Sequence, residues 1–538
     1  MKLWQKITLA LIFVASFGLM IYLAKTDSIT ADEPVHLSAG YLHIVKGSYK
    51  YNTEHPPLMN DFSGIFIKVF VNPKLPEEPP GALDQYDYGY KFIYQMGNSA
   101  ERIIFWGRFP VILLFLATMA MVFLWSKKLW GANGALFSTF LAAICPNLLA
   151  NGHLATTDVI ITFSALLNLY LLCNFIEESS WKNAIYFGLA TGLLLLSKFS
   201  GLTVLLFAAL LYFLFIFLKK QKLDWDKISK LLVSMAIAFF MVWLIYIVSM
   251  WFDWRWSFYQ YNLHNFFGLS WFKNLAKWFI LPLMKFWDGF GMVTDHNKYG
   301  HLAYLNGKFS QMGFWDYFPY AFWYKTPLAI VVILALSVIK NLRKINHKKH
   351  AVLLLILAPL FYFLFSMTGH IDIGVRHILV IYPFLYILAG GLILTRNKSL
   401  KAVILILTIA AILTNLLTFP DYLSFMNKSG IKDGTLQISD SNYDWGQNLN
   451  RFSEVLSEKN INEVYFDCYS SWPLSIQDIK VKSLPDKPVN GLIAMCAQQY
   501  FLKLHNEEGI PFKWFLKETP TGQFETIYYW DYLTTGQN

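Results

Sequence analysis

Charged residues are scarce in this sequence of 538 residues, where they make up 15%, against about 25% in an average soluble domain. Hydrophobic residues make up 55%, and the mean hydropathy is +0.39. A chain with so few charges does not have the composition of a soluble surface. The composition therefore excludes an ordinary soluble protein and predicts an integral membrane protein.

Cysteine is scarce as well. Cys145 and Cys173 lie in apolar segments, and Cys468 and Cys496 lie in the C-terminal region. There is no C-x-x-C pair and no spacing typical of a metal site, which speaks against a cysteine-based metal or redox centre. Cys468 and Cys496 fall on neighbouring predicted strands, which leaves a disulfide in an oxidising compartment and two free buried thiols as open alternatives.

Acidic residues are fewer than basic ones, 35 against 45, which gives a formal net charge of +10. In a soluble protein this excess would suggest a nucleic-acid partner. Here the basic residues fall in every second loop between apolar segments, namely Lys2 and Lys6, Lys127 and Lys128, 219–230, 340–349 and 396–401. The positive-inside rule makes these loops cytoplasmic, together with the N-terminus, and we expect no nucleic-acid partner.

Long apolar runs are what the sequence has in abundance. About eleven of them have nearly the length that spans a bilayer: 6–24, 105–126, 132–150, 158–176, 183–197, 201–218, 231–251, 321–340, 351–368, 378–395 and 401–419. An odd number places the two termini on opposite sides of the membrane. The segments 25–104, 150–157, 252–320, 369–377 and everything after 420 are then extracytoplasmic.

Two domains follow from this pattern. Residues 1–420 form the transmembrane domain, whose first run is read as an uncleaved anchor because its apolar part is longer than that of a signal peptide. The aromatic stretches 60–70 and 271–287 are predicted to lie along the membrane interface. Residues 421–538 have a soluble composition, with strands near 435–439, 463–469, 491–497 and 525–532 and a helix at 447–459. A small extracytoplasmic α/β domain is expected there.

The first predicted extracytoplasmic loop carries two clusters of acids and histidines. Asp32 and Glu33 are followed by His36 and His43, and Glu54-His55 comes next. A helix that begins at Asp32 places this acid and both imidazoles on one face, where the carboxylate can act as a general base on a hydroxyl. The alternative is that Asp32 is only an N-cap, with Pro34 in the first turn of the helix.

Ionisable groups at the same ends of other spans form the second set of candidates. Asp158 opens one span, and capping is the simpler explanation for it. Six cationic or titratable side chains lie near span ends: Arg102, Arg108, Lys198, Lys325, Arg376 and His377. A single such residue usually snorkels to the lipid headgroups. The loop 369–377 instead combines two histidines, an aspartate and Arg376, which suits a bound phosphate.

The motifs resemble a known family. Asp32-Glu33-x-x-His36 followed by Glu54-His55-Pro56-Pro57-Leu58 is similar to the first outer loop of protein O-mannosyltransferases and their bacterial relatives, the GT-C glycosyltransferases of family 39. The likeness continues at His301-x-x-Tyr304-Leu305-x-Gly307, 313–319, Lys325-Thr326-Pro327, 373–377 and 440–447.

The resemblance implies an inverting transfer of a sugar from a polyprenyl-phosphate donor to a protein, lipid or glycan acceptor, in a bacterial inner membrane. Asp32 would be the base and Glu33 its companion. The donor phosphate and sugar would be bound by Glu54, His55, Arg102, Asp158, Lys198, Lys325, Arg376 and His377.

No cofactor is implied with certainty, but a divalent metal stays open. The chain is also similar to lipid A aminoarabinose transferases, in which a glutamate and a distant histidine hold a metal. In this sequence Glu54 would be the glutamate, and the candidate histidines are His264, His296 and His301.

Two other classes are weighed against an enzyme of this family. A polytopic transporter would show paired repeats and charges near mid-span, and the sequence shows neither. A polymer ligase of the cell envelope would not demand the combination of Asp32-Glu33 with His55-Pro56-Pro57.

Overall fold

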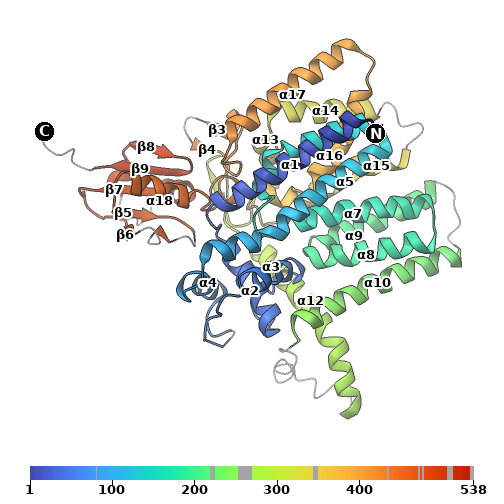
Figure 1. The fold of residues 1–538 in the computed structure, drawn as a ribbon, viewed down its shortest axis with the longest axis horizontal. Helices are drawn as coiled ribbons and strands as arrows, with labels where there is room; N and C mark the ends of the chain where they lie inside the picture. The colour runs from blue at the N-terminus through green and yellow to red at the C-terminus, as the bar shows by residue number, and fades with distance from the viewer. Residues whose placement is uncertain are drawn as a thin grey trace.

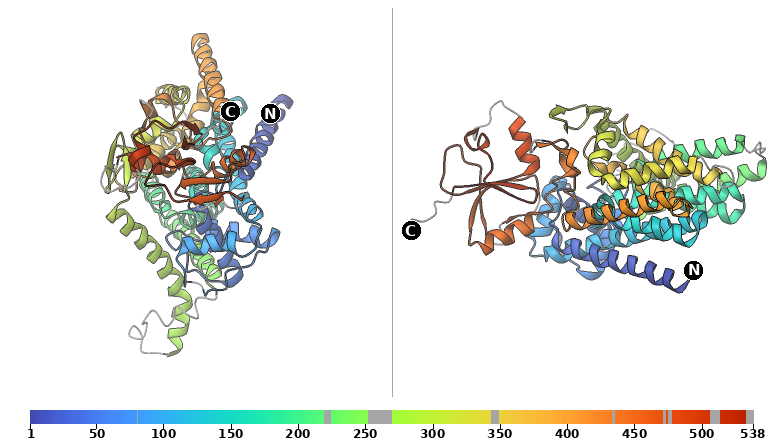
Figure 2. Two further views of the ribbon diagram at one scale, coloured as in Figure 1. Left: turned by 90° about the vertical axis from the view of Figure 1, so that its left-hand side faces the viewer. Right: turned by 90° about the horizontal axis from the view of Figure 1, so that it is seen from above.

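The computed structural model describes residues 1–79, 81–218, 224–251, 270–342, 349–432, 435–470, 473–474, 478–505 and 513–532. It consists of a bundle of long helices and a small sheet domain at one end of that bundle (Figure 1). The right-hand view of Figure 2 shows the same separation from above, with the N-terminus toward the end of the bundle that is far from the sheet.

Within the described residues, six helices are long and apolar enough to cross a membrane: α1 (Leu3–Thr26), α5 (Ala100–Ala143), α7 (Asp158–Glu177), α9 (Gly201–Leu218), α10 (Trp225–Ser249) and α17 (Lys398–Thr418). A bent pair, α13 (Tyr317–Lys325) with α14 (Leu328–Leu342), makes a seventh if it counts as one span. The remaining apolar helices are shorter: α8 (Trp181–Ser197), α15 (Lys349–Ser366) and α16 (Ile381–Ala389), which η4 (Gly390–Leu394) continues. The predicted class, an integral membrane protein with many helices, is confirmed.

The predicted count of eleven full-length spans differs from what the structure shows, although each predicted segment is helical over most of its length. Two predicted spans, 105–126 and 132–150, are joined in α5, which breaks at Gly131 (φ 73°, ψ −176°), a backbone geometry open essentially to glycine alone. The second of them continues into α6 (Pro146–Asn151). The predicted span 321–340 bends by 113° between α13 and α14, where Pro327 cannot donate a helical hydrogen bond.

The segment between α1 and α5 folds into short helices: α2 (Glu33–Lys46), α3 (Leu58–Phe70), α4 (Gln85–Tyr90) and the π-turn η1 (Lys91–Gln95). The helices α2 and α3 cross at two glycines. A Cβ added to Gly40 would lie 1.8 Å from the Asn60 carbonyl oxygen, and one on Gly64 would lie 2.2 Å from the Gly40 carbonyl oxygen. This crossing fixes the start of α2 next to the residues that precede α3. The predicted interfacial stretches are helical, within α3 and within α12 (Ser270–Tyr299).

The C-terminal part is the predicted α/β domain. Its five-stranded sheet has the order β6-β5-β7-β9-β8, with β5 (Glu463–Asp467) parallel to β6 (Lys480–Lys482) and to β7 (Leu492–Cys496). The strands β8 (Gly522–Phe524) and β9 (Ile527–Asp531) complete it in antiparallel fashion. Three helices belong to this domain: α18 (Leu449–Glu458), α19 (Ala497–His505) and α20 (Lys513–Leu516).

Alternating side chains of β7 enter two separate apolar clusters. Leu492 and Ala494 pack with Phe452 of α18, whereas Ile493 and Met495 join the other cluster. Both faces of β7 are therefore covered, as expected for a strand with an unbroken apolar sequence. Two short hairpins, β1–β2 (Ala303–Leu305 and Lys308–Ser310) and β3–β4 (Ile431–Lys432 and Thr435–Leu436), lie between the helices and this sheet, since Leu305 bridges to Ile438.

Candidate active site

A cavity of about 550 Å³ lies between the helix bundle and the sheet domain, and we call it the junction cavity. Its walls come from six parts of the chain: the α1–α5 segment, the turn before α7, the turn between α8 and α9, α12 with the β1–β2 hairpin, the loop before α16, and the sheet domain. The ionisable side chains that line it are Asp32, His36, Glu54, His55, Tyr86, Lys198, His296, His301, Tyr304, Arg376, His377, Asp440 and Tyr469.

Asp32 stands at the N-cap position of α2, but its side chain makes no capping hydrogen bond. Instead Asp32 faces the junction cavity, and its Oδ2 lies 3.2 Å from Nη1 of Arg376. The capping alternative for this side chain is therefore not what the structure shows. One helical turn later, the His36 ring also faces the cavity, with Nδ1 within 2.8 Å of both Asn60 Oδ1 and Asn52 Nδ2. The His36 and His55 rings lie 5.2 Å apart.

Arg376, one of the cations that line the cavity, is held by contacts on several sides. It belongs to the 3-10 turn η3 (Val375–Ile378), and its guanidinium lies over the Trp445 ring, 4.0 Å from the ring centre. Its Nε donates to Ser441 Oγ at 3.0 Å, and its Nη1 lies 3.7 Å from Asp158 Oδ2. An arginine held by a ring, a hydroxyl and two carboxylates has little rotamer freedom left, so its charge is pre-positioned.

Lys198 is the second fixed cation, in the turn between α8 and α9, with Nζ 2.7 Å from Asp158 Oδ1. Asp158 itself does not line the cavity, because its side chain is only 1% exposed and lies behind the two cations. Asp158, which the resemblance places among the donor-binding residues, therefore contacts the two cations rather than the cavity itself. The predicted capping role is not seen either, since the N-cap of α7 is Thr157. The carboxylate holds both cations in place from behind.

Two histidines of the cavity, His55 and His377, are held as neutral groups. Burial, then His36 and Lys198, lower the pKa of His55 well below its usual value. Burial, then Lys198 and Arg376, lower the pKa of His377 in the same way. Near neutral pH both rings are therefore uncharged hydrogen-bonding groups, and the fixed positive charge in the cavity comes from the lysine and the arginine.

Glu33, which the sequence pairs with Asp32, does not line the cavity. It is completely buried, and Arg108, also completely buried, contacts both of its oxygens, Nε to Oε1 at 2.8 Å and Nη2 to Oε2 at 2.6 Å. The backbone amides of Thr30 and Ala155 donate to the same carboxylate. Both carboxylate oxygens of Glu33 are thus occupied by hydrogen bonds and cannot take a proton from a substrate hydroxyl. The structure therefore gives Glu33 a structural role rather than a catalytic one.

Two predicted phosphate ligands also lie away from the cavity. Arg102 is exposed on the first turn of α5 and donates to the Phe70 carbonyl at 2.7 Å. Lys325 is buried, and its Nζ donates to the backbone carbonyls of Leu423 and Asn442, which ties α13 to the segment that leads into the sheet domain. The sequence places Arg102 and Lys325 at the end of the bundle where the junction cavity lies. It does not show whether their side chains face that cavity.

The metal candidates that the structure describes do not form a group of three converging ligands. Glu54, His296 and His301 line the cavity, but His296 Nε2 and His301 Nδ1 lie 3.1 Å apart as a hydrogen-bonded pair, and Gln85 donates to Glu54 at 3.0 Å. Within the described ranges, the one group with three ligand atoms within 4.8 Å of one another is Asp444, Cys468 and Cys496. The candidate His264 lies outside the described residues.

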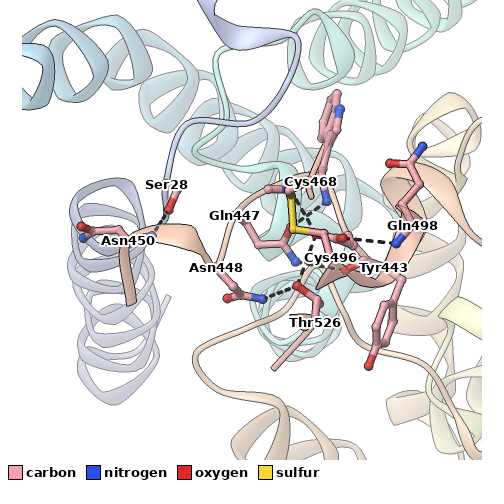
Figure 3. The surroundings of a disulfide bond; sticks show 12 residues. Ser28, Tyr443, Gln447, Asn448, Asn450, Cys468, Cys496, Gln498 and Thr526 are labelled. Carbon is pink, nitrogen blue, oxygen red and sulfur yellow. Dashed lines mark hydrogen bonds between the residues drawn. A yellow bond between two sulfur atoms is a disulfide. The ribbon is translucent and has the colours of Figure 1, made fainter. Parts of the chain in front are cut away.

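The two cysteines of that group form a disulfide, which leaves no thiolate for a metal (Figure 3). Of the two alternatives that the sequence left open for Cys468 and Cys496, the bonded one is therefore found. Cys145 and Cys173 belong to no disulfide and are buried in the helix bundle.

Several cavity residues were not predicted as site residues. Asp440 and Trp445 belong to a motif that carries the family resemblance, so a signal for them existed. Tyr86, Tyr469 and Gln498 come from the first long loop and from the ends of two strands, and no local pattern marks them. They reach the cavity through contacts between distant parts of the chain.

One family profile matches part of the chain. The sequence profile of the family described as dolichyl-phosphate-mannose-protein mannosyltransferase matches residues 91–246, which run from η1 to α10 and include Asp158 and Lys198. A search of curated protein sequences found no match.

Solved structures are similar over nearly the whole chain at low identity. ArnT from Cupriavidus metallidurans bound to undecaprenyl phosphate has a TM-score of 0.49 and 12% identity, covering 98% of each chain. The archaeal oligosaccharyltransferase AglB from Archaeoglobus fulgidus, solved with an inhibitory peptide and a dolichol-phosphate, has a TM-score of 0.46 and 12% identity, covering 95% of this chain and 72% of that one. The profile match confirms the resemblance to the family 39 glycosyltransferases in residues 91–246, a range that contains none of the motifs quoted for it.

Proposed function

We propose that this protein is an inverting glycosyltransferase that moves a sugar from a polyprenyl-phosphate donor to an acceptor hydroxyl in the junction cavity. The observation that carries the proposal is the arrangement of Asp32, Arg376 and Lys198 in one cavity where apolar helices meet a soluble domain. The match to the mannosyltransferase family supports sugar transfer as the reaction class.

The donor phosphate binds at Arg376 and Lys198. Both cations share Asp158, and Arg376 also pairs with Asp32, so an anion that displaces Asp32 from Arg376 meets two cations held by one shared carboxylate. The guanidinium offers two parallel N–H groups to phosphate oxygens, while the ammonium acts as a point charge. As the bond between the sugar and the phosphate breaks, negative charge grows on the leaving oxygen, and fixed cations stabilise that transition state more than the ground state.

Asp32 is the general base. Its side chain is 32% exposed and paired with Arg376 at 3.2 Å, so a phosphate that engages the arginine releases the carboxylate. The carboxylate then takes the proton of the acceptor hydroxyl while the acceptor oxygen forms a bond to the anomeric carbon. The bond from that carbon to the phosphate oxygen breaks, and polyprenyl phosphate leaves with the electron pair. A single displacement of this kind inverts the anomeric centre.

The sheet domain and the junction cavity are assigned to the extracytoplasmic side of a bacterial inner membrane. The alternation of basic loops supports this orientation, with the N-terminus in the cytoplasm. The disulfide between Cys468 and Cys496 supports it independently, because such bonds persist in oxidising compartments. The positions of the ionisable groups speak against a transport pathway, because the cavity lies at the end of the bundle rather than at mid-span.

Binding of undecaprenyl phosphate tests the donor site. Replacing Arg376 by Gln should weaken binding about 10- to 100-fold, the worth of a charge-assisted hydrogen-bonding partner. The matched control is Arg102→Gln, an arginine at the same end of the bundle that does not line the cavity, and its binding should stay within about twofold of the wild type. Equal losses in the two variants, or none in Arg376→Gln, would remove the phosphate site from the cavity.

A further inference from the structure

The two walls of the junction cavity differ in charge. The helical wall carries Lys198 and Arg376. Among the described residues that line the cavity, those after residue 420 include no lysine, arginine or histidine; they offer Asp440, Trp445, Tyr469 and two glutamines, with apolar neighbours. A phosphate is therefore attracted to the helical wall, and the wall of the sheet domain suits an uncharged ligand.

The sheet domain meets the cavity at the carboxyl ends of two adjacent parallel strands. Tyr469 follows the end of β5, and Gln498 and Gln499 follow the end of β7. The chain leaves β5 toward β6 on one side and leaves β7 toward β9 and β8 on the other. In open α/β sheets, ligands bind outside the carboxyl ends of the strands where the connections diverge in this way.

The disulfide lies at the same position and links these two ends. Cys468 directly precedes Tyr469, and Cys496 is two residues before Gln498 (Figure 3). The Gln498 backbone amide also donates to Asp444 Oδ2 at 3.3 Å. The Gln498 side chain lies with its Nε2 3.4 Å from Asp440 Oδ2. The cross-link and these contacts hold the cavity-facing residues of the two strands in fixed relative positions.

Two exposed tyrosines flank the proposed base. Tyr86 of α4 is 48% exposed and Tyr469 is 53% exposed, and both line the cavity. Burial of part of each ring, and then the charge of Asp32, raise the pKa of both phenols, that of Tyr86 to about 12. Both rings therefore lie within electrostatic reach of Asp32, one on the helical side and one on the sheet side of the cavity.

We infer that the ends of β5 and β7 form the acceptor subsite and that it takes a neutral saccharide, a conclusion that rests on the proposed glycosyl transfer. Aromatic rings offer flat apolar faces to a sugar ring, and glutamine amides donate to and accept from its hydroxyls. The lack of a cation in this wall disfavours a phosphorylated or acidic acceptor. A peptide bound by strand addition needs an edge strand, whereas β5 and β7 are inner strands of the sheet.

The test measures saccharide binding to the purified full chain in lipid nanodiscs, without donor. The probes are the neutral disaccharides mannobiose, cellobiose and N,N′-diacetylchitobiose, mannose 6-phosphate, and a peptide rich in serine and threonine. The wild type should bind a neutral disaccharide, and Tyr469→Ala should weaken that binding at least about tenfold, or about 1.4 kcal/mol. The matched control is Tyr299→Ala, a 69% exposed tyrosine at the end of α12 outside the cavity lining, which should bind as the wild type does.

A second variant, Cys468→Ser with Cys496→Ser, should also weaken disaccharide binding while undecaprenyl phosphate binding stays unchanged. Failure of the wild type to bind any of the neutral disaccharides would overturn the inference. The inference would also be overturned if the wild type bound the peptide or mannose 6-phosphate instead of the neutral disaccharides and if that binding depended on Tyr469. The donor is measured separately: a wild type that does not bind undecaprenyl phosphate would overturn the proposed function, and a wild type that binds it but no saccharide would overturn only the acceptor subsite.

Discussion

An Asp32→Asn variant should transfer sugar about 10²- to 10⁴-fold more slowly than the wild type, the usual contribution of a general base. The amide that replaces the carboxylate keeps the size of the side chain but cannot take a proton from the acceptor. Binding of undecaprenyl phosphate should not weaken, because Arg376 loses a carboxylate that competes with the phosphate at 3.2 Å. Transfer rates and binding constants measured on the same preparation check both halves of this expectation.

The control for this variant is Glu101→Gln, which neutralises an exposed acid on the first turn of α5, outside the cavity lining. Its transfer rate should equal that of the wild type. If Asp32→Asn also kept the rate of the wild type, Asp32 would not be the base. If the variant lost donor binding together with the rate, its carboxylate would act in donor recognition instead.

Replacing the neighbouring acid, Glu33→Gln, should act on stability rather than on chemistry. The substitution leaves Arg108 as a buried charge without its carboxylate, which costs about 3–5 kcal/mol of unfolding free energy. A large drop of the thermal midpoint in detergent is the expected result. The fraction of the protein that remains folded should keep a normal rate per molecule.

A paired replacement tests whether this effect comes from the buried charge. Glu33→Gln combined with Arg108→Met removes both charges, and the double variant should be more stable than Glu33→Gln alone. A Glu33→Gln protein with an unchanged midpoint and a reduced rate per folded molecule would return Glu33 to the catalytic group.

These two variants also show where sequence reasoning reaches its limit. Asp32 and Glu33 are adjacent, and the motif treats them as a pair. At the start of α2, however, consecutive side chains point about 100° apart, so one faces the cavity while the other faces the helix bundle. Which of the two faces the cavity depends on how α2 packs on α3 and α5, and that packing is fixed by Gly40 and Gly64, which are distant in sequence from Arg108.

The same limit applies to the cations. The hydropathy pattern places Arg102, Lys198, Lys325 and Arg376 near the ends of apolar segments, and each of those segments is helical. The pattern does not show that Arg102 lies on the surface or that Lys325 ties α13 to the segment before the sheet domain. Nor does it show that Lys198 and Arg376 line the cavity. The polar neighbours of Arg376 in 369–377 predicted its place in the site better than its position at the end of an apolar segment did. Several polar groups in one short loop indicate a shared ligand.

Long-range contacts of the sheet domain were the least predictable. Its strands and helix follow from short apolar runs and from periodic apolar residues, as in β7 and α18 respectively. Tyr469 and Gln498 reach the cavity only because β5 and β7 are neighbours in the sheet and end on the side of the helix bundle. No local sequence pattern predicts that β5 and β7 are neighbours. The disulfide between Cys468 and Cys496 links these strands, but from the sequence two free thiols were an equal alternative.

The central claim is that the junction cavity cleaves a polyprenyl-phosphate sugar, and the most direct measurement is a single turnover with excess purified protein. Undecaprenyl phosphate carrying a radiolabelled sugar is incubated with the wild type and with Arg376→Gln, in the presence of an envelope extract as acceptor. We expect the wild type to release one undecaprenyl phosphate for each sugar transferred, with the opposite anomeric configuration in the product, and Arg376→Gln to release almost none. Retained configuration, or equal release by the two proteins, would contradict the account.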